Sequence, residues 1–333
     1  MRAFVLEKKT LKLVEMPEQK PEENEVLVQI EYIGINYADI LSRKGLYGWK
    51  PKRPYIPGME ASGMIIEVGK NVPAERIGQK VMIGTQNGCY AERVVVPSYQ
   101  ALVAIPHFTM QENAAFLVTF MTAWIMLFEL AHLKSSDTVL ISAAAGGVGS
   151  AAVHLACKLG CKVYGLAGSE EKVDFIKKSG AVNAFNYRQS DWAGLVRSEI
   201  HHADVILEFV GGDVYKTCFD LLGPFGRIGI AGFTSFNLKK WNPFSWYRTW
   251  RDMPRIPIAR LAKKTGSVLA SHLGYLLKEP EKLLEIYNRL VNYTTNYKIK
   301  PVIDREFPFQ DALQAQKFIE QRNNIGKVLL KSL

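Results

Sequence analysis

A glycine-rich turn between an apolar strand and a helix places the strongest constraint on how this chain can fold. Residues 137–149 read DTVLISAAAGGVG, and the helical pattern SAAVHLACKLG follows. This context is the one that a dinucleotide fingerprint requires, because glycines bring the backbone close to a pyrophosphate and the start of the helix attracts the anion. The alternative is a turn with a structural role alone. We expect a nucleotide loop at Ala145, Gly146, Gly147, Val148 and Gly149.

The segments after this turn alternate between strand and helix patterns. We expect strands at KVYGLAGS, ADVILEFVGG, GRIGIAGF and SVLASHLGYLL, and helices at EEKVDFIKKSG, EKLLEIYNRLVNYT and DALQAQKFIEQRN. Such alternation predicts a parallel sheet with helices on both faces. Before the turn, GQKVMIG and ERVVVP are short β-branched strands, and a helix is expected over residues 37–44. The fold class is therefore α/β, with a β-rich first part and a doubly wound parallel sheet.

The end of the second strand of this alternating region bears on which cofactor binds. Proteins that prefer NAD have an acid there, which binds the ribose 2′-hydroxyl group. Here Gly168 and Ser169 occupy the region, and Lys172 follows. A hydroxyl and an ammonium group suit a 2′-phosphate, so we expect NADPH. Glu170 and Glu171 complicate this reading, although acids are favourable at the start of a helix; Lys172 can also be a solvated surface lysine.

Cysteine usage and the apolar runs limit the class of protein. The four cysteines form no CxxC pair and no Cys/His cluster with zinc spacing, so we expect reduced thiols. The N-terminal residues lack the apolar core of a signal peptide. The apolar run 114–128 is shorter than the roughly 20 residues of a spanning helix, so we expect it to be buried. These features predict a cytoplasmic protein.

Six segments extend these expectations over nearly the whole chain. In order they are GINYADILSRKGLY, YIPGMEASG, GCYAERVVV, AAFLVTFMTAW, AAAGGVG and NNIGKVLL. The chain resembles the medium-chain dehydrogenase/reductase superfamily and, within it, the zinc-independent quinone oxidoreductase family. ENAAFLVTFMTAW, SHLGYL and IKPVIDREFPF resemble its vesicle amine transport protein group.

The resemblance implies a domain organisation. It places a GroES-like catalytic domain at residues 1–118, a Rossmann NADPH-binding domain at 119–279, and a return to the catalytic domain at 280–333. It also implies a substrate cleft between the domains and a homodimer. An edge strand such as SVLASHL suits pairing between two copies.

The resemblance also bears on metal binding. Asn36, Met59 and Val118 stand where zinc alcohol dehydrogenases have their Cys, His and Cys ligands. None of these three residue types is a good zinc ligand, and the cysteine-rich lobe of the structural zinc is missing. We therefore expect no metal, and hydride transfer to a small apolar quinone or α,β-unsaturated carbonyl rather than alcohol oxidation.

The resemblance implies further cofactor-binding residues. Asn36 and Thr122 would line the nicotinamide; the alternatives are a helix N-cap and a hydroxyl bonded to its own backbone. Tyr187 corresponds to a tyrosine near the adenosine 2′-phosphate, and it can also be an exposed residue at a strand end. Phe233 and Gly274 would border the nicotinamide, with packing as the alternative.

The helix expected over 37–44 contributes candidate catalytic groups. Asn36, Asp39 and Arg43 fall on one face of it. Tyr47 follows the helix, and its phenol can donate a hydrogen bond to a carbonyl oxygen as enolate charge grows. We name Asn36, Tyr47 and Asp39 as candidate catalytic residues. The alternatives are packing for Tyr47 and an ion pair between Asp39 and Arg43.

The segment 239–264 departs from a simple reductase. Its eight basic residues are opposed only by Asp252, so it holds seven of the ten net positive charges of the chain. Among them lie the aromatic residues Trp241, Phe244, Trp246, Tyr247 and Trp250. Such a mixture suits contact with an anionic membrane, a lid over an apolar substrate, or a packed loop.

The membrane reading supplies a second hypothesis, a peripheral lipid-binding protein of the same fold with little or no reductase activity. Nucleic acid is not expected as a partner, because these basic residues belong to no nucleic-acid-binding module.

Overall fold

The chain forms two compact units. The computed structural model describes residues 1–48, 51–231, 247 and 250–332. The first unit comprises Met1–Met121 and Leu273–Leu333, and the second comprises Thr122–His272. Phe233 and most of the aromatic residues of segment 239–264 lie outside the described residues. The domain bounds 1–118, 119–279 and 280–333 stay predictions.

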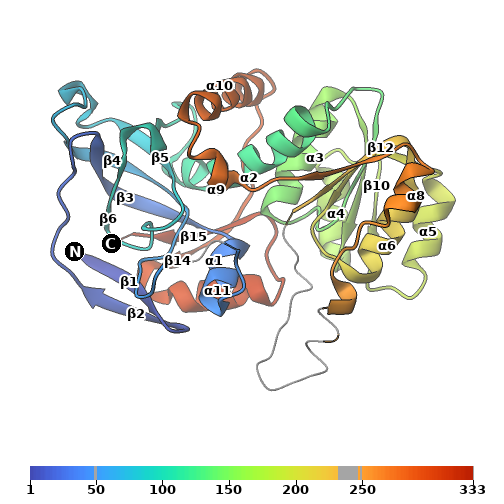
Figure 1. Ribbon diagram of the computed structural model, residues 1–333, viewed down its shortest axis with the longest axis horizontal. Helices are drawn as coiled ribbons and strands as arrows, with labels where there is room; N and C mark the ends of the chain where they lie inside the picture. Colours follow the sequence, from blue (N-terminus) through green and yellow to red (C-terminus); the bar gives the residue numbers. More distant parts are fainter. Residues whose placement is uncertain (49–50, 232–246, 248–249, 333) are drawn as a thin grey trace. The chain divides into compact units, whose positions relative to one another are not determined.

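The second unit contains a six-stranded parallel sheet (Figure 1). Its strands are β8 (Thr138–Ile141), β9 (Lys162–Ala167), β10 (Asn183–Asn186), β11 (Ala203–Glu208), β12 (Leu222–Ile230) and β13 (Ser267–Ala270). Their spatial order is β10-β9-β8-β11-β12-β13, and every pairing is parallel. The order reverses between β8 and β11, as in a doubly wound sheet. The predicted fold class is confirmed.

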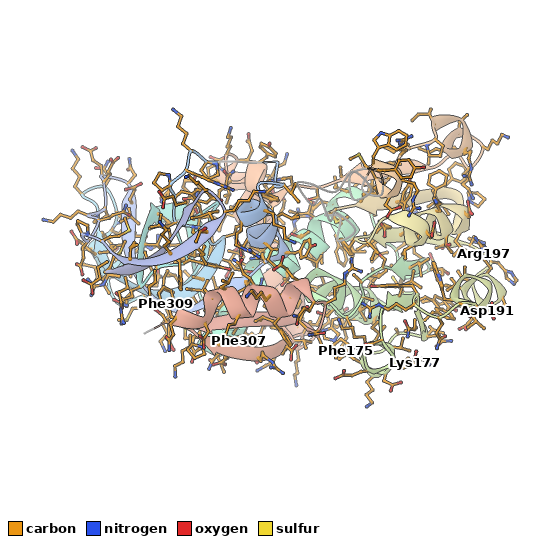
Figure 2. All side chains as sticks on the ribbon, turned by 90° about the horizontal axis from the view of Figure 1, so that it is seen from below. Phe175, Lys177, Asp191, Arg197, Phe307 and Phe309 are labelled. Carbon is orange, nitrogen blue, oxygen red and sulfur yellow. The ribbon has the colours of Figure 1, made fainter. Side chains whose placement is uncertain are left out.

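Helices cover both faces of this sheet. α3 (Gly147–Leu159) and α4 (Glu170–Lys178) pack on β8, β9 and β10. The opposite face carries α5 (Trp192–Glu199) and α6 (Gly212–Leu221), whose buried side chains join those of the strands in one core cluster. A further short helix, α8 (Ile258–Ala262), precedes β13. Figure 2 shows Lys177 on α4 and Arg197 on α5.

One strand prediction in this region is wrong beyond its first residues. SVLASHLGYLL forms a strand only over β13, and the short helix α9 (Leu273–Leu276) follows. An apolar run does not by itself distinguish a strand from a helical turn, because both bury apolar side chains.

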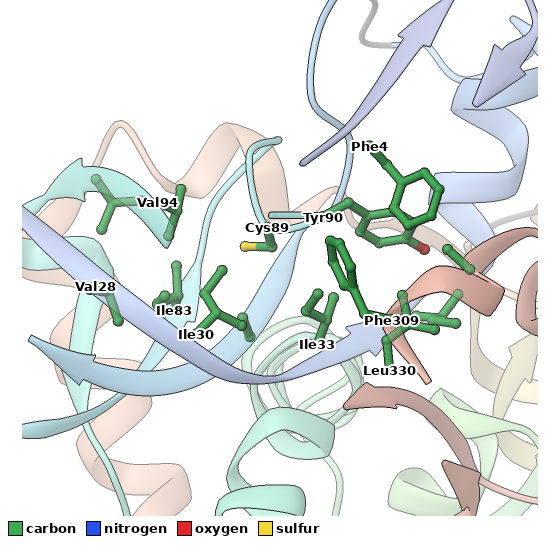
Figure 3. Close-up of a cluster of buried hydrophobic side chains, with 14 of the residues drawn as sticks. Phe4, Val28, Ile30, Ile33, Ile83, Cys89, Tyr90, Val94, Phe309 and Leu330 are labelled. Carbon is green, nitrogen blue, oxygen red and sulfur yellow. The ribbon is translucent and has the colours of Figure 1, made fainter. Parts of the chain in front are cut away.

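The first unit is built on a seven-stranded sheet. Its strands are β3 (Glu25–Ile35), β4 (Glu60–Val68), β5 (Lys80–Gly84), β6 (Arg93–Pro97), β7 (Ala101–Val103), β14 (Ile303–Pro308) and β15 (Lys327–Lys331). The order is β14-β15-β3-β4-β5-β7, with β6 also paired to β3; β1 (Arg2–Glu7) and β2 (Thr10–Glu15) form a separate hairpin. Figure 3 shows part of the hydrophobic core of this unit, where the rings of Phe4, Tyr90 and Phe309 lie together.

Helices complete the first unit. They include α1 (Tyr37–Lys44), α9, α10 (Pro280–Asn296), α11 (Ala312–Glu320) and the 3-10 turns η1 (Ala74–Arg76), η2 (Ser98–Gln100) and η4 (Phe309–Asp311). The chain enters the second unit within α2 (Met110–Trp124), which continues as the π-helical η3 (Ile125–Leu130).

The helix formed by α2 and η3 is longer than the apolar run suggests. Met110–Leu130 has 21 residues, so by length and composition it could cross a membrane. The expectation that it is too short is wrong. However, 72% of its most apolar window is buried, as in a core helix, which confirms the expected burial.

Candidate functional site

The nucleotide loop adopts a compact shape that depends on glycine. Ala143 has a left-handed φ of 46°, and its carbonyl oxygen accepts a hydrogen bond from the N–H of Gly146 at 2.9 Å. A Cβ on Gly149 would lie 2.3 Å from this same oxygen. The first N–H groups of α3 have no partners within the helix and carry its positive dipole. The loop therefore presents backbone donors that suit an anion.

A second feature lies at the end of β9. A Cβ on Gly168 would lie 3.0 Å from the Tyr187 hydroxyl oxygen and 3.3 Å from Nε of Arg188. Glycine at this position thus lets the Tyr187 phenol and the Arg188 guanidinium lie close against the backbone. No acid among the described residues forms an ion pair with Arg188. Sequence reasoning missed Arg188, although it directly follows Tyr187.

The remaining residues predicted for this region lie on α4. Ser169 is the N-cap of the helix, and Lys172 lies in its first turn. The carboxylate of Glu170 accepts hydrogen bonds from the amides of Asn186, at 2.6 Å, and Gln189, at 3.0 Å. The acid that complicated the choice of NADPH is therefore engaged with residues at and beyond the end of β10.

Polar side chains gather in the first unit at the end of β3. We call them the buried network, which consists of Asn36, Glu60 and Lys327. Strand register brings them together, because Glu60 pairs with Gly34 across β3 and β4, while Val328 pairs with Ile35 across β3 and β15. All three side chains are at most 8% exposed.

The contacts of the buried network fix the orientation of the Asn36 amide. Lys327 forms an ion pair with Glu60 and donates to Oδ1 of Asn36 at 2.7 Å. Nδ2 of Asn36 donates to Glu60 at 2.9 Å and to the Gly34 carbonyl at 3.3 Å. An ammonium only donates and a carboxylate only accepts, so the reverse orientation is excluded. Asn36 therefore has no N–H left for a ligand.

Asp39 lies next to this network. Its carboxylate is 1% exposed and accepts hydrogen bonds from the Asn36 N–H at 2.9 Å and the Tyr90 hydroxyl at 3.4 Å. Burial raises the pKa of Asp39 to about 7. Asn36 is the N-cap residue of α1, so the alternative of a helix N-cap is confirmed for its backbone. A catalytic role for Asp39 stays a prediction.

Two other residues near α1 behave differently from each other. The Arg43 guanidinium bonds to Gln316 and to Glu320, both at 2.7 Å, so the alternative of an ion pair with Asp39 is wrong. Burial raises the pKa of Tyr47 to about 12. The phenol of Tyr47 therefore holds its proton at neutral pH.

The last predicted residues belong to separate parts of the chain. Thr122 lies near the end of α2 in the second unit, whereas Gly274 lies in α9 of the first unit. The Gly274 carbonyl accepts a hydrogen bond from the Gln86 amide at 2.7 Å. Contacts of Asn36, Thr122 and Gly274 with a nicotinamide stay predictions, and Phe233 lies outside the described residues.

Sequence reasoning also missed Glu60 and Lys327. Each is a charged residue in an otherwise apolar strand segment, GMEASG or GKVLL. A charge that is buried in a strand needs a partner, and this requirement is the signal that could have linked the two. Within the described ranges, no group of three or more His, Cys, Asp or Glu residues could hold a metal ion.

Comparison with known proteins agrees with this architecture. Residues 22–107 match the model of the alcohol dehydrogenase GroES-like domain, and residues 147–289 match that of the zinc-binding dehydrogenase. The synaptic vesicle membrane protein VAT-1 homolog of Mus musculus is 32% identical over 314 residues, which cover 93% of this chain and 77% of that protein.

Solved structures of quinone oxidoreductases have the same fold. The Thermus thermophilus enzyme, which was also solved with NADPH, is 30% identical with a TM-score of 0.82 over 99% of this chain and 100% of that one. The Escherichia coli enzyme in complex with NADPH is 26% identical with a TM-score of 0.86, and the match covers 99% and 98% of the two chains. The chain therefore belongs to the quinone oxidoreductase family of medium-chain dehydrogenases/reductases, in the branch of the vesicle membrane protein VAT-1.

Proposed function

We propose that this protein is an NADPH-dependent oxidoreductase that transfers a hydride to a quinone or an α,β-unsaturated carbonyl compound. The observation that carries the choice of cofactor is the position of the Tyr187 hydroxyl and the Arg188 guanidinium, which lie close against Gly168 just after β9. A cation and a hydroxyl suit a phosphate, whereas an acid would suit a free 2′-hydroxyl. The expected homodimer and cytoplasmic location are part of this proposal.

The described residues fit NADPH at both of its anionic groups. The N–H groups of Gly147, Val148 and Gly149 at the start of α3 would hold the pyrophosphate. Tyr187 and Arg188, with Lys172 and Ser169 on α4, would hold the 2′-phosphate. Both places favour glycine, because a Cβ at Gly149 would lie 2.3 Å from the Ala143 carbonyl oxygen and a Cβ at Gly168 would lie 3.0 Å from the Tyr187 hydroxyl oxygen.

NADPH supplies a hydride when bound. Asn36 cannot donate to the substrate oxygen, because Glu60 and Gly34 accept both of its N–H groups. We therefore assign proton or hydrogen-bond donation to Tyr47. Its raised pKa of about 12 keeps the phenol protonated and makes it a weaker acid, which favours donation of a hydrogen bond over transfer of the proton. Asn36 would line the nicotinamide with its fixed amide, and Asp39 would hold the start of α1 in place.

The test is a titration of NADPH and NADH by nicotinamide fluorescence, followed by oxidation with a panel of quinones and enones. Arg188→Gln should weaken NADPH binding about tenfold and leave NADH binding nearly unchanged, because one charge-assisted hydrogen bond to the 2′-phosphate is lost. Binding of NADH in preference to NADPH by the unmodified protein would contradict the proposal. Tight binding of NADPH without turnover of any quinone or enone would contradict the proposed reductase activity.

Two control variants separate the local effect from the change in net charge. Arg197→Gln removes an arginine from α5 that pairs with Asp220 at 3.5 Å, and it should leave both affinities unchanged. Lys172→Gln should also weaken NADPH binding more than NADH binding. Its control is Lys177→Gln, which removes another lysine of α4 (Figure 2) and should leave both affinities unchanged. Equal weakening of NADPH and NADH by Arg188→Gln would mean that Arg188 acts through the fold.

A second candidate function is a peripheral contact with an anionic membrane. The described part of segment 239–264 exposes large apolar side chains. Their exposed fractions lie between 44% and 69% for Tyr247, Trp250, Met253, Ile256 and Ile258. The Arg255 guanidinium lies 3.9 Å from the centre of the Trp250 ring. Exposed aromatic rings beside cations suit the headgroup region of a membrane.

Flotation with phosphatidylserine vesicles tests this second function. The double variant Trp250→Ala, Ile258→Ser should stop flotation, whereas Leu195→Ser on α5, where Leu195 is 44% exposed, should not. Binding that depended on charge alone would disappear at moderate salt in every variant. A protein that stays at the bottom of the gradient at low salt has no such contact.

A further inference from the structure

A buried carboxylate joins the two strands at which the order of the second sheet reverses. Glu208 is the last residue of β11, and Ser142 directly follows β8, its neighbour in the sheet. In doubly wound sheets, ligands bind beyond the carboxyl ends of the strands at this reversal. Both side chains are 0% exposed.

Glu208 accepts hydrogen bonds from three different groups. Its carboxylate accepts the N–H of Val210 at 2.8 Å, the N–H of Gly211 at 3.0 and 3.1 Å, and the Ser142 hydroxyl at 3.0 Å. The Ser142 hydroxyl oxygen in turn accepts the N–H of Phe209 at 2.8 Å. The turn after β11 is thus tied to the residue that precedes the nucleotide loop.

The hydrogen bond between Glu208 and Ser142 lies next to Ala143, the strained residue of the loop. Ala143, next to Ser142, has a φ of 46°, which a residue with a side chain adopts only when its surroundings hold it there. Its carbonyl oxygen is the one that accepts from Gly146 and faces Gly149. The position of Ser142 therefore sets the direction of the peptide around which the loop closes.

We infer that Glu208, acting through Ser142, is a positioning residue for the nucleotide loop and sets its affinity for a pyrophosphate. This inference rests on the proposed NADPH binding. Glu208 forms its bonds to the chain itself, so its effect reaches the ligand through the loop backbone. The acid therefore contributes to the binding of an anion by ordering the N–H groups that bind it.

Glu208→Gln tests the inference while keeping the size of the side chain. Glutamine can keep Oε1 as the acceptor for Ser142, Val210 and Gly211, but its NH₂ group then takes the place of Oε2 and faces the Gly211 N–H, donor against donor. We expect NADPH and NADH to bind about tenfold more weakly, by the same factor, because both contain the pyrophosphate. Adenosine 2′-monophosphate lacks the pyrophosphate, so its affinity should not change.

The chain offers a matched control at the other end of the same two strands. Asp204 of β11 accepts the N–H of Thr138, the first residue of β8, at 2.8 Å. Asp204→Asn removes a carboxylate that also links β11 to β8, but at the amino ends of the strands. It should lower the thermal midpoint without changing the affinity for NADPH. Ser142→Ala removes only the hydroxyl that links Glu208 to the loop. It should also lower the affinity for NADPH, by a smaller factor than Glu208→Gln.

The affinities for NADPH, NADH and adenosine 2′-monophosphate, with the thermal midpoint of each variant, decide between the outcomes. The inference fails if Glu208→Gln and Ser142→Ala bind NADPH like the unmodified protein, or if Asp204→Asn weakens NADPH to the same extent. It also fails if the affinity for adenosine 2′-monophosphate falls by the same factor, because the substitution then disturbs more than the pyrophosphate site. Absence of NADPH binding by the unmodified protein would instead overturn the proposed function, and the positioning role with it.

Discussion

The nucleotide loop of the second unit and the buried network of the first unit satisfy buried polar groups in opposite ways. The loop is one continuous segment, 143–149, in which backbone groups form the hydrogen bonds and side chains are small or absent. The network joins Asn36, Glu60 and Lys327, which are far apart in the sequence, through charged side chains. The difference teaches that the loop should be sensitive to added volume, whereas the network should be sensitive to a change of charge.

The strongest test of this comparison removes one charge from the network. Lys327→Met leaves the Glu60 carboxylate buried without its counter-charge, so the free energy of unfolding should fall by about 3–5 kcal/mol in urea titrations. The double variant Glu60→Gln, Lys327→Met should recover part of this loss, because no unpaired charge remains.

The matched control lies on the same strand. Lys331→Met changes an exposed lysine at the end of β15 and should alter the free energy of unfolding by less than about 0.5 kcal/mol. Equal effects at positions 327 and 331 would mean that the ion pair contributes little.

The second test adds volume to the loop. Gly149→Ala places a methyl group against the Ala143 carbonyl oxygen, so the loop must shift and NADPH should bind at least about tenfold more weakly. Ser150→Ala, one residue further on, removes a hydroxyl without adding volume and should bind NADPH normally. Normal binding by Gly149→Ala would show that the loop tolerates added volume.

The last test concerns pH and Asp39. The folded-state pKa of about 7 lies above the value of 3.8 for an unperturbed aspartate. Between these values the folded state binds more protons than the unfolded state, so Asp39 lowers the free energy of unfolding as pH rises from about 4 to 7.

This contribution has a slope of at most about 1.4 kcal/mol per pH unit, and it is constant above pH 7. Asp39→Asn cannot ionise and should remove it. The measurement is the difference between the stability profiles of the two proteins across this range. Parallel profiles would mean that the pKa of Asp39 is ordinary in the folded state.

The same contrast explains how far the sequence predicts the structure. The helix expected over 37–44 agrees with α1, because Asn36 at its start and Gly45, with a φ of 75°, at its end are local signals. The loop at 143–149 is equally local. The ion pair of Glu60 and Lys327 depends instead on the register of β3 against β4 and β15, which no short segment specifies.

Two further misses have different causes. The segment after Ala270 is apolar and turns into α9, since apolar character suits either a strand or a helix. Arg188 is adjacent to the predicted Tyr187, but its place beside Gly168 depends on where the chain emerges from β10 relative to β9. Local patterns therefore predict the elements of the site, while pairing between strands decides which side chains meet.

The antiparallel pairing of β15 with β3 has a consequence for biosynthesis. Chains leave the ribosome from the N-terminus at about 5–20 residues per second, so Lys327 follows Glu60 on the order of tens of seconds later. During this interval residues 122–272 are already available to fold, whereas the nascent first unit still lacks both β15 and the ammonium that neutralises Glu60. The unit whose synthesis begins first is thus the one whose folding finishes last.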